Sequence, residues 1–125
     1  DGGTISGNNG DVRGGGVYVK GKSSSFTMKA GSISSNNASY GGGVYIQGYL
    51  NDRSSFTMSG GTIDDNSATY EGGGVLVFEG TFDMSAGSIK SNKTTAQDTG
   101  ADSLSNGGGV CVDGNSVFNF TTVNF

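Results

Sequence analysis

Short apolar stretches recur along the chain, and in each of them apolar and polar residues alternate. At positions 17–19 two valines flank Tyr18, at positions 26–28 Phe and Met flank a threonine, and Ile5 lies between two hydroxyl residues. An alternation of period two places one set of side chains on each face of an extended strand. No stretch repeats apolar residues at helical spacing, so the pattern predicts short β-strands and no helix.

Three motifs repeat in a constant order. Gly-Gly-Gly-Val starts at Gly14, Gly41, Gly72 and Gly107; Phe-x-Met starts at Phe26, Phe56 and Phe82, with a degenerate copy at Phe118; Gly-Thr/Ser-Ile starts at Gly3, Gly31, Gly61 and Gly87. Each Met precedes the next Ile by five residues, and each Ile precedes an Asn by three. The Ile-to-Ile period is 28, 30 and 26 residues. The fixed spacings indicate a tight corner, and the variable ones, such as those across residues 47–55 and 93–106, indicate loops that accept insertions.

The repeat predicts an all-β fold, a right-handed parallel β-helix (β-solenoid) of about four coils with three short strands each. Like strands of successive coils would stack about 4.8 Å apart, and their Val, Ile, Phe and Met side chains would fill one narrow core. Right-handed winding follows from the strong preference of parallel crossovers. We expect residues 1–125 to form one domain without separate caps. A β-meander or sandwich competes with this interpretation, but it would pair unlike strands.

Composition alone favours disorder, because the chain has 25 glycines and many Ser, Thr and Asn residues, although its charged fraction of only 14% is low for a disordered chain. The regular placement of large apolar residues argues against that reading. A net charge of −4 with scattered basic residues disfavours nucleic acid as a partner, and no apolar run is long enough for a membrane span. Cys111 is the single cysteine, so no internal disulfide can form. The chain starts at Asp1 rather than Met, and we interpret it as a processed product or an excised fragment.

Two columns of residues are interpreted as structural. The Asn of each repeat is expected to join a hydrogen-bonded ladder at a tight bend: Asn8, Asn36, Asn66 and Asn92. The last Gly of each triplet is expected at a sharp corner, where it permits positive φ and close approach of coils: Gly16, Gly43, Gly74 and Gly109. A phosphate-binding role is disfavoured, because a strand rather than a helix follows each triplet.

A third column lies between the core valines of each repeat: Tyr18, Tyr45, Leu76 and Cys111. Alternation places these side chains on the outer face, where they would form an exposed apolar strip. Such a strip is either an ordinary external stack or a contact surface for a neighbouring molecule. It is therefore a candidate interaction surface.

Enzymatic chemistry has little support. The chain has no His for acid–base catalysis or metal binding, and Asp64-Asp65 is the only adjacent acidic pair. Two carboxylates can hydrolyse a glycoside in principle, which keeps a pectin-lyase-like, polysaccharide-degrading enzyme as the weakest alternative. The acids do not form the Gly-rich nonapeptides of calcium-binding β-rolls, and the outward Thr columns are too irregular for ice binding. We expect no enzyme, no cofactor and no metal.

The strings GGTISGN, FTMSGGTIDDN and GGGVYV resemble the Gly-rich β-helix repeats of bacterial and archaeal surface proteins, namely adhesin-like and polymorphic outer-membrane proteins. The likeness covers essentially the whole chain. A proper FxxN motif and a signal peptide are missing, so the secretion route of those proteins is not carried over. The resemblance implies an extracellular or cell-surface location and a non-catalytic role in adhesion or assembly, with a cell-surface glycan or protein as one partner.

The two ends of the chain fall at nearly the same point of the coil. Phe120 takes the Met position, and Phe125 takes the Ile position that Ile5 takes at the start. Open solenoid ends expose core and strand edges. We therefore expect Ile5, Phe120 and Phe125 to contact either neighbouring coils of a longer chain or another copy, stacked head to tail into a filament. The expected function is structural, with an adhesin segment as the alternative.

Overall fold

The computed structural model describes residues 2–96 and 107–121, which form strands and turns but no helix. The strands are β1 (Thr4–Ser6), β2 (Val17–Lys20), β3 (Ser25–Met28), β4 (Ser32–Ser34), β5 (Asn37–Tyr40), β6 (Val44–Gln47), β7 (Ser54–Asp64), β8 (Ser67–Glu71), β9 (Val75–Phe78), β10 (Gly80–Lys90), β11 (Lys93–Thr94), β12 (Val110–Asp113) and β13 (Val117–Phe120). Most are short and rich in β-branched, aromatic and hydroxyl residues, which favour the pleated conformation.

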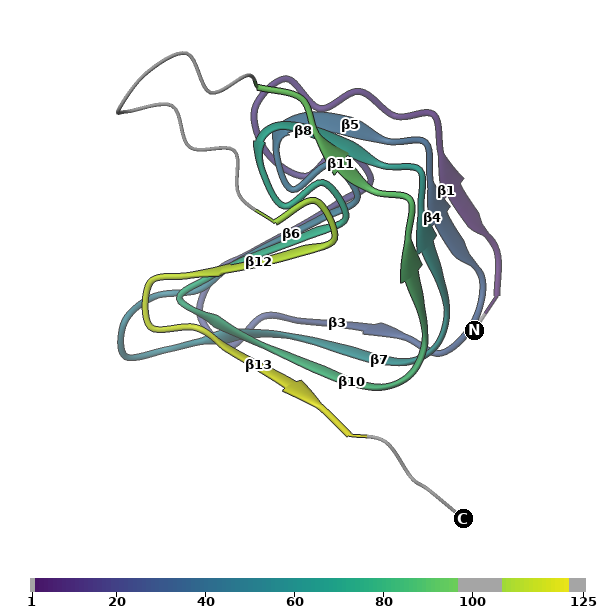
Figure 1. Ribbon diagram of the computed structural model, residues 1–125. Coiled ribbons are helices and arrows are strands. Elements are labelled where there is room, and N and C mark those ends of the chain that lie inside the picture. Colours follow the sequence, from purple (N-terminus) through teal and green to yellow (C-terminus); the bar gives the residue numbers. More distant parts are fainter. Residues whose placement is uncertain (1, 97–106, 122–125) are drawn as a thin grey trace.

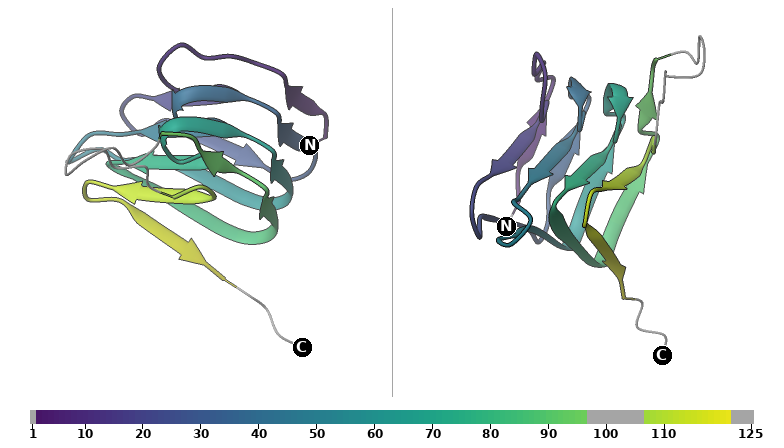
Figure 2. Two further views of the ribbon diagram at one scale, coloured as in Figure 1. Left: turned by 45° about the horizontal axis from the view of Figure 1, so that its top comes forward. Right: turned by 90° about the vertical axis from the view of Figure 1, so that its left-hand side faces the viewer.

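These strands pair in parallel and build three sheets (Figure 1). One sheet runs β1-β4-β7-β10-β13, with β3 also paired to β7; the second runs β2-β6-β9-β12, and the third β5-β8-β11. Neighbours in a sheet come from successive repeats, and equal motif positions face each other, as in Ile5↔Ile33 and Phe56↔Phe82. The predicted parallel β-solenoid is confirmed. Figure 2 shows its coils stacked from the N-terminal coil to the yellow strands near the C-terminus.

Two details of the coil differ from the prediction. The stack has about three turns rather than four, because four copies of a motif enclose only three full turns. A full turn also holds four strand segments rather than three, as in β4, β5, β6 and the first half of β7. The additional segment follows the ladder asparagine. It pairs with its equivalents as β5, β8 and β11, where the variable spacing had indicated a loop.

The tight corner between Met and Ile is a bend within a single strand. β7 and β10 each run through both motifs, and their pairing shows register shifts between Met84 and Ser88. Gly61 and Gly87 lie in this bend with φ of 88° and 104°, values that L side chains rarely adopt. The constant spacing of five residues is therefore a bulged bend that needs glycine.

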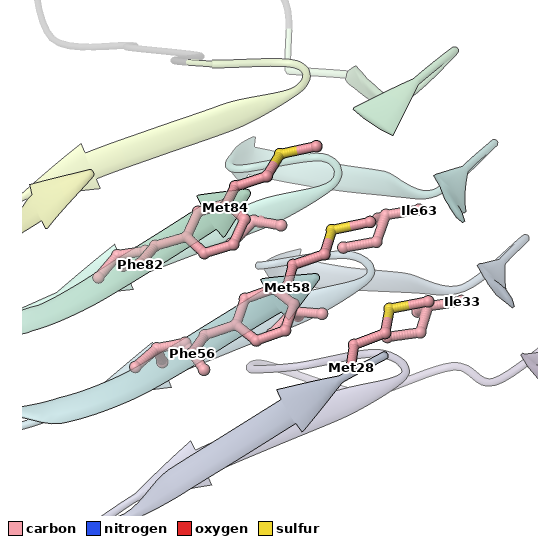
Figure 3. Close-up of a cluster of buried hydrophobic side chains, with 11 residues drawn as sticks. Met28, Ile33, Phe56, Met58, Ile63, Phe82 and Met84 are labelled. Atoms are coloured by element: carbon pink, nitrogen blue, oxygen red, sulfur yellow. The ribbon is translucent and has the colours of Figure 1, made fainter. Parts of the chain in front are cut away.

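The core lies inside the ring of sheets and consists of ladders of like side chains (Figure 3). Phe56 and Phe82 are fully buried, with ring centroids 4.6 Å apart and an interplanar angle of 4°. Phe26 and Phe118 extend this stack at 5.2 Å and 4.8 Å. Methionine and isoleucine ladders run beside it. Because each coil buries its side chains against the coils above and below, the ladders are only half-covered in the terminal coils.

Candidate functional site: the end faces and the outer groove

The four asparagines form a continuous hydrogen-bonded ladder along the solenoid axis. Asn36 and Asn66 are buried. Asn66 Oδ1 accepts two hydrogen bonds from Asn36, one from its backbone N–H and one from Nδ2, both at 3.0 Å. Asn66 Nδ2 in turn donates to Ile33 O and to Asn92 Oδ1, each at 2.9 Å. Every polar atom of the Asn66 side chain is thus satisfied, which fits a structural role.

The ladder is directional, because each asparagine accepts from the preceding coil and donates to the following one. Asn8 gives its backbone N–H and Nδ2 to Asn36 Oδ1 at 3.0 and 2.9 Å. Within the described residues, Asn8 Oδ1 accepts no hydrogen bond and the backbone N–H of Asn92 donates none. The N-terminal end of the solenoid therefore presents an acceptor, and the C-terminal end presents a donor.

The two roles predicted for the third Gly of each triplet, positive φ and close approach of coils, belong to two different glycines. Positive φ belongs to the first Gly of each triplet, not to the predicted third: Gly14 (63°), Gly41 (63°), Gly72 (62°) and Gly107 (59°). The third Gly is needed for close approach, because a Cβ on Gly43 would lie 2.6 Å from Gly74 O, and one on Gly74 would lie 2.5 Å from Gly109 O. A Cβ on Gly16 would likewise meet Gly43 O at 2.8 Å. At Gly109 the nearest atom would be Ile89 Cγ2, at 3.9 Å.

The predicted apolar strip is a column in register, but its centre is not exposed. Tyr18 faces Tyr45, and Leu76 faces both Tyr45 and Cys111. Tyr45 and Leu76 are only 6% and 2% exposed, whereas Tyr18 is 40% exposed and Cys111 is half-buried. The chain bends sharply between the third sheet and β6 or β9 (Figure 1), and Arg13, Tyr40 and Glu71 line one groove with Tyr45 and Leu76. The expectation of a continuous exposed strip was wrong.

A groove of about 230 Å³ lies beside this column. Its lining includes Arg13, Tyr40, Tyr45, Glu71 and Asp113. The Arg13 guanidinium carbon lies 5.9 Å from the centre of the Tyr45 ring. Burial raises the pKa of the Tyr45 hydroxyl, although Arg13 acts in the opposite direction. Burial also raises the pKa of the Cys111 thiol to about 11, with smaller contributions from Glu71 and Asp113.

The acidic pair considered for catalysis does not line this groove. Asp64 is the last residue of β7, and its Oδ1 accepts a hydrogen bond of 3.5 Å from Ser32 Oγ. Asp65 is exposed in the turn before Asn66, with φ of 52°. No group of three or more His, Cys, Asp or Glu side chains in the described ranges is arranged to hold a metal ion.

The N-terminal end face contains a hollow of about 290 Å³ between β1 and β3. Apolar residues Ile5, Phe26, Met28 and Ile33 line it, together with Gly2 and Gly3 among others. Inside the stack the corresponding space holds a methionine of the preceding coil, because a Cβ on Gly61 would lie 2.6 Å from Met28 Cε and one on Gly87 2.6 Å from Met58 Cε. The hollow therefore has the position that, inside the stack, is filled by the methionine of the preceding coil.

The C-terminal end face exposes the other side of the same core. Val112, Val117, Phe118 and Phe120 are 40%, 38%, 38% and 58% exposed. Phe120 pairs with Met84, as predicted from its place at the Met position. Phe125, the other predicted end contact, lies outside the described residues. Ile5 at the opposite end is only partly buried and packs on the core.

No family model, curated protein or solved structure matches this chain. Within the described ranges, no helix is long and apolar enough to cross a bilayer. The resemblance to surface-protein repeats therefore has support only at the level of the solenoid fold. Sequence reasoning placed Ile5 and Phe120 at the two end faces, where the structure has them. It missed the outer groove, because Arg13 and Glu71 lie in segments that had been predicted as loops.

Proposed function

We propose that this chain is a non-catalytic, extracellular structural protein whose solenoid is continued at both ends by equivalent coils. The coils come from further copies, stacked head to tail into a filament, or from a longer surface fibre of which this chain is a segment. The observation that supports this function is the complementarity of the end faces. One face presents exposed Phe118 and Phe120, and the other presents the hollow beside Ile5.

Unpaired parallel strand edges add to this argument. In the described part of the chain, β1, β2 and β3 form one end of their sheets, and β12 and β13 form the other. Such edges offer rows of backbone donors and acceptors to another strand. Because both ends belong to the same repeat, a heterologous contact between them would not close on itself and would build an open fibre.

Electron microscopy and light scattering of the purified chain across a wide concentration range test the filament. We expect fibres with an axial repeat of four strand spacings per copy, about 19 Å. Monomers at every concentration would contradict self-stacking. The intact mass of the native protein separates the two sources of coils: 12.5 kDa indicates separate copies, and a much larger mass indicates a segment of a longer fibre.

An adhesin segment is the second candidate, and the outer groove favours it. Arg13, Glu71 and Asp113 surround aromatic side chains there, and a cell-surface glycan or protein would meet both charged and aromatic groups. Binding of the chain to cells, lost on Arg13→Ala, would support this role. The weakest alternative, a polysaccharide-degrading enzyme, predicts turnover of pectin-like polymers that Asp64→Asn and Asp65→Asn abolish.

A further inference from the structure

We infer that the partner at the C-terminal face is the N-terminal face of a second copy of this chain, seated in one fixed register. In this register Tyr18 of the second copy stacks on Cys111, Lys20 on Asp113, and Phe26 on Phe118. The inference rests on the proposed stacking function and specifies its contact surface.

The apolar contacts repeat those between the inner coils. Phe26 faces Phe56, Phe56 faces Phe82 and Phe82 faces Phe118, so Phe26 of a second copy is the next ring in the series. Phe120 occupies the position of Met58 and Met84. It would enter the hollow of the second copy, where Gly31 takes the place that Gly61 and Gly87 have beside the inner methionines.

The polar contacts favour the same arrangement. Lys20, Gln47, Phe78 and Asp113 form one column in register, so the next residue after Asp113 is Lys20 of the second copy. Opposite charges would then lie on adjacent strands about 4.8 Å apart. The backbone N–H of Asn92, which has no acceptor among the described residues, would meet Asn8 Oδ1, which has no donor among them, and the ladder would continue across the junction.

A two-fold contact between two C-terminal faces fits less well. It would place the Asn92 donors of both copies at one junction without an acceptor, and both Phe120 side chains would protrude from the same kind of surface. Asp113 of each copy would also face a junction that lacks Lys20. In the head-to-tail contact the Asn92 donor meets the Asn8 acceptor, Phe120 enters a hollow, and Asp113 faces the cationic Lys20.

A disulfide tests the register directly, because Cys111 is the only cysteine. In Tyr18→Cys, residues 18 and 111 of neighbouring copies would have Cα atoms about 4.8 Å apart, within the disulfide range of about 4.4–6.8 Å. In one copy they are separated by the strands β6 and β9, about 14 Å, which is too far. We expect a ladder of disulfide-linked oligomers on a non-reducing gel, formed with a copper–phenanthroline oxidant at alkaline pH and lost on reduction.

Thr27→Cys is the matched control, since position 27 lies in the first sheet and its column ends at Asn119, not at Cys111. It should give no ladder. Charge exchange is an independent test. Lys20→Glu and Asp113→Lys should each weaken assembly several-fold at low salt, and an equimolar mixture of the two should recover it, because each junction in an alternating polymer again joins opposite charges.

The outcomes separate the register from the proposed function. Fibres without the Tyr18→Cys ladder, or fibres indifferent to both charge changes, would overturn the register while the stacking function stands. Disulfide-linked dimers of wild-type chain through Cys111 would indicate the two-fold contact and overturn the register as well. Monomers of the wild-type chain at all concentrations would overturn self-stacking itself.

Discussion

Asn66 shows how a single buried amide can hold neighbouring coils together. Its side chain accepts two hydrogen bonds from Asn36 and donates to Ile33 O and Asn92 Oδ1. Asn66→Ala removes these bonds and leaves buried partners unsatisfied, each at a cost of about 1–3 kcal/mol. We expect the free energy of unfolding to fall by about 3 kcal/mol or more, measured by urea denaturation.

Asn37→Ala is the matched control for this prediction. Asn37 neighbours the ladder and also bonds an asparagine of the preceding coil, Asn9, at 3.1 Å, but its side chain is exposed. Its removal should change the free energy of unfolding by no more than about 0.5 kcal/mol. A loss as large as that of Asn66→Ala would show that burial of the amide is not what matters.

The residue before each ladder asparagine adopts the left-handed conformation in every coil: Gly7 (66°), Ser35 (55°), Asp65 (52°) and Ser91 (54°). An L residue is strained there by about 1–2 kcal/mol, and glycine is not. Asp65→Gly should therefore raise the free energy of unfolding by about 0.5–1 kcal/mol after the entropy of glycine is included. Asp64→Gly, one residue earlier in strand β7, should lower it instead. Thermal unfolding followed by circular dichroism would compare the two.

Residue identity allowed some of these features to be predicted and concealed others. The ladder followed from an Asn always three residues after Ile. The left-handed position did not, because Gly, Ser, Asp and Ser share no chemical signature there. Three consecutive glycines likewise do not reveal which one has positive φ, and the first rather than the third has it.

At the level of elements, the aromatic stack shows why the strands keep their register. Phe82 is fully buried between Phe56 and Phe118. Phe82→Ala opens a cavity that neighbouring coils cannot fill by collapse, and we expect a loss of about 3–5 kcal/mol in the free energy of unfolding. Phe118→Ala, at the partly exposed end of the stack, should cost less than half as much. Equal losses in a denaturant titration would contradict this account.

The strands β5, β8 and β11 were the elements that the sequence did not predict. Their segments read Asn-Ala-Ser-Tyr, Ser-Ala-Thr-Tyr-Glu and Lys-Thr, with no large apolar alternation. Only small side chains, Ala38 and Ala68, are buried there. Such strands are held by backbone pairing between coils, for example Ser67 N–H to Asn36 O at 2.9 Å. Hydrophobic periodicity does not report this kind of pairing.

For the whole molecule, repetition made the solenoid predictable, because the strand pattern inferred for one coil applies to every other coil. The burial of Tyr45 and Leu76 could not be predicted in the same way. Alternation tells which side chains leave the core face of a strand. It does not tell which segment then covers the other face, since that depends on the angle at which the glycine corner turns the chain.

The end faces lead to a prediction that separates folding from assembly. In the inner coils a Cβ on Gly74 would collide with Gly109 O at 2.5 Å, so Gly74→Ala should unfold or strongly destabilise the chain. Gly109 has the same place in its repeat, but a Cβ added there would make only an ordinary van der Waals contact, with its nearest atom 3.9 Å away. Gly109→Ala should therefore leave the free energy of unfolding within about 0.5 kcal/mol of wild type.

In a filament, however, Gly109 would face the carbonyl oxygen of Gly16 of the next copy, as Gly74 faces that of Gly109. The added methyl group would then prevent the close approach of the two coils, and fibres should be absent by electron microscopy at concentrations where the wild-type chain assembles. Coil-to-coil contact is so close at this position that a small shift of the second copy cannot relieve the collision without breaking the strand pairing beside it. A Gly109→Ala chain that folds and still forms wild-type fibres would mean that the next copy does not continue the glycine column.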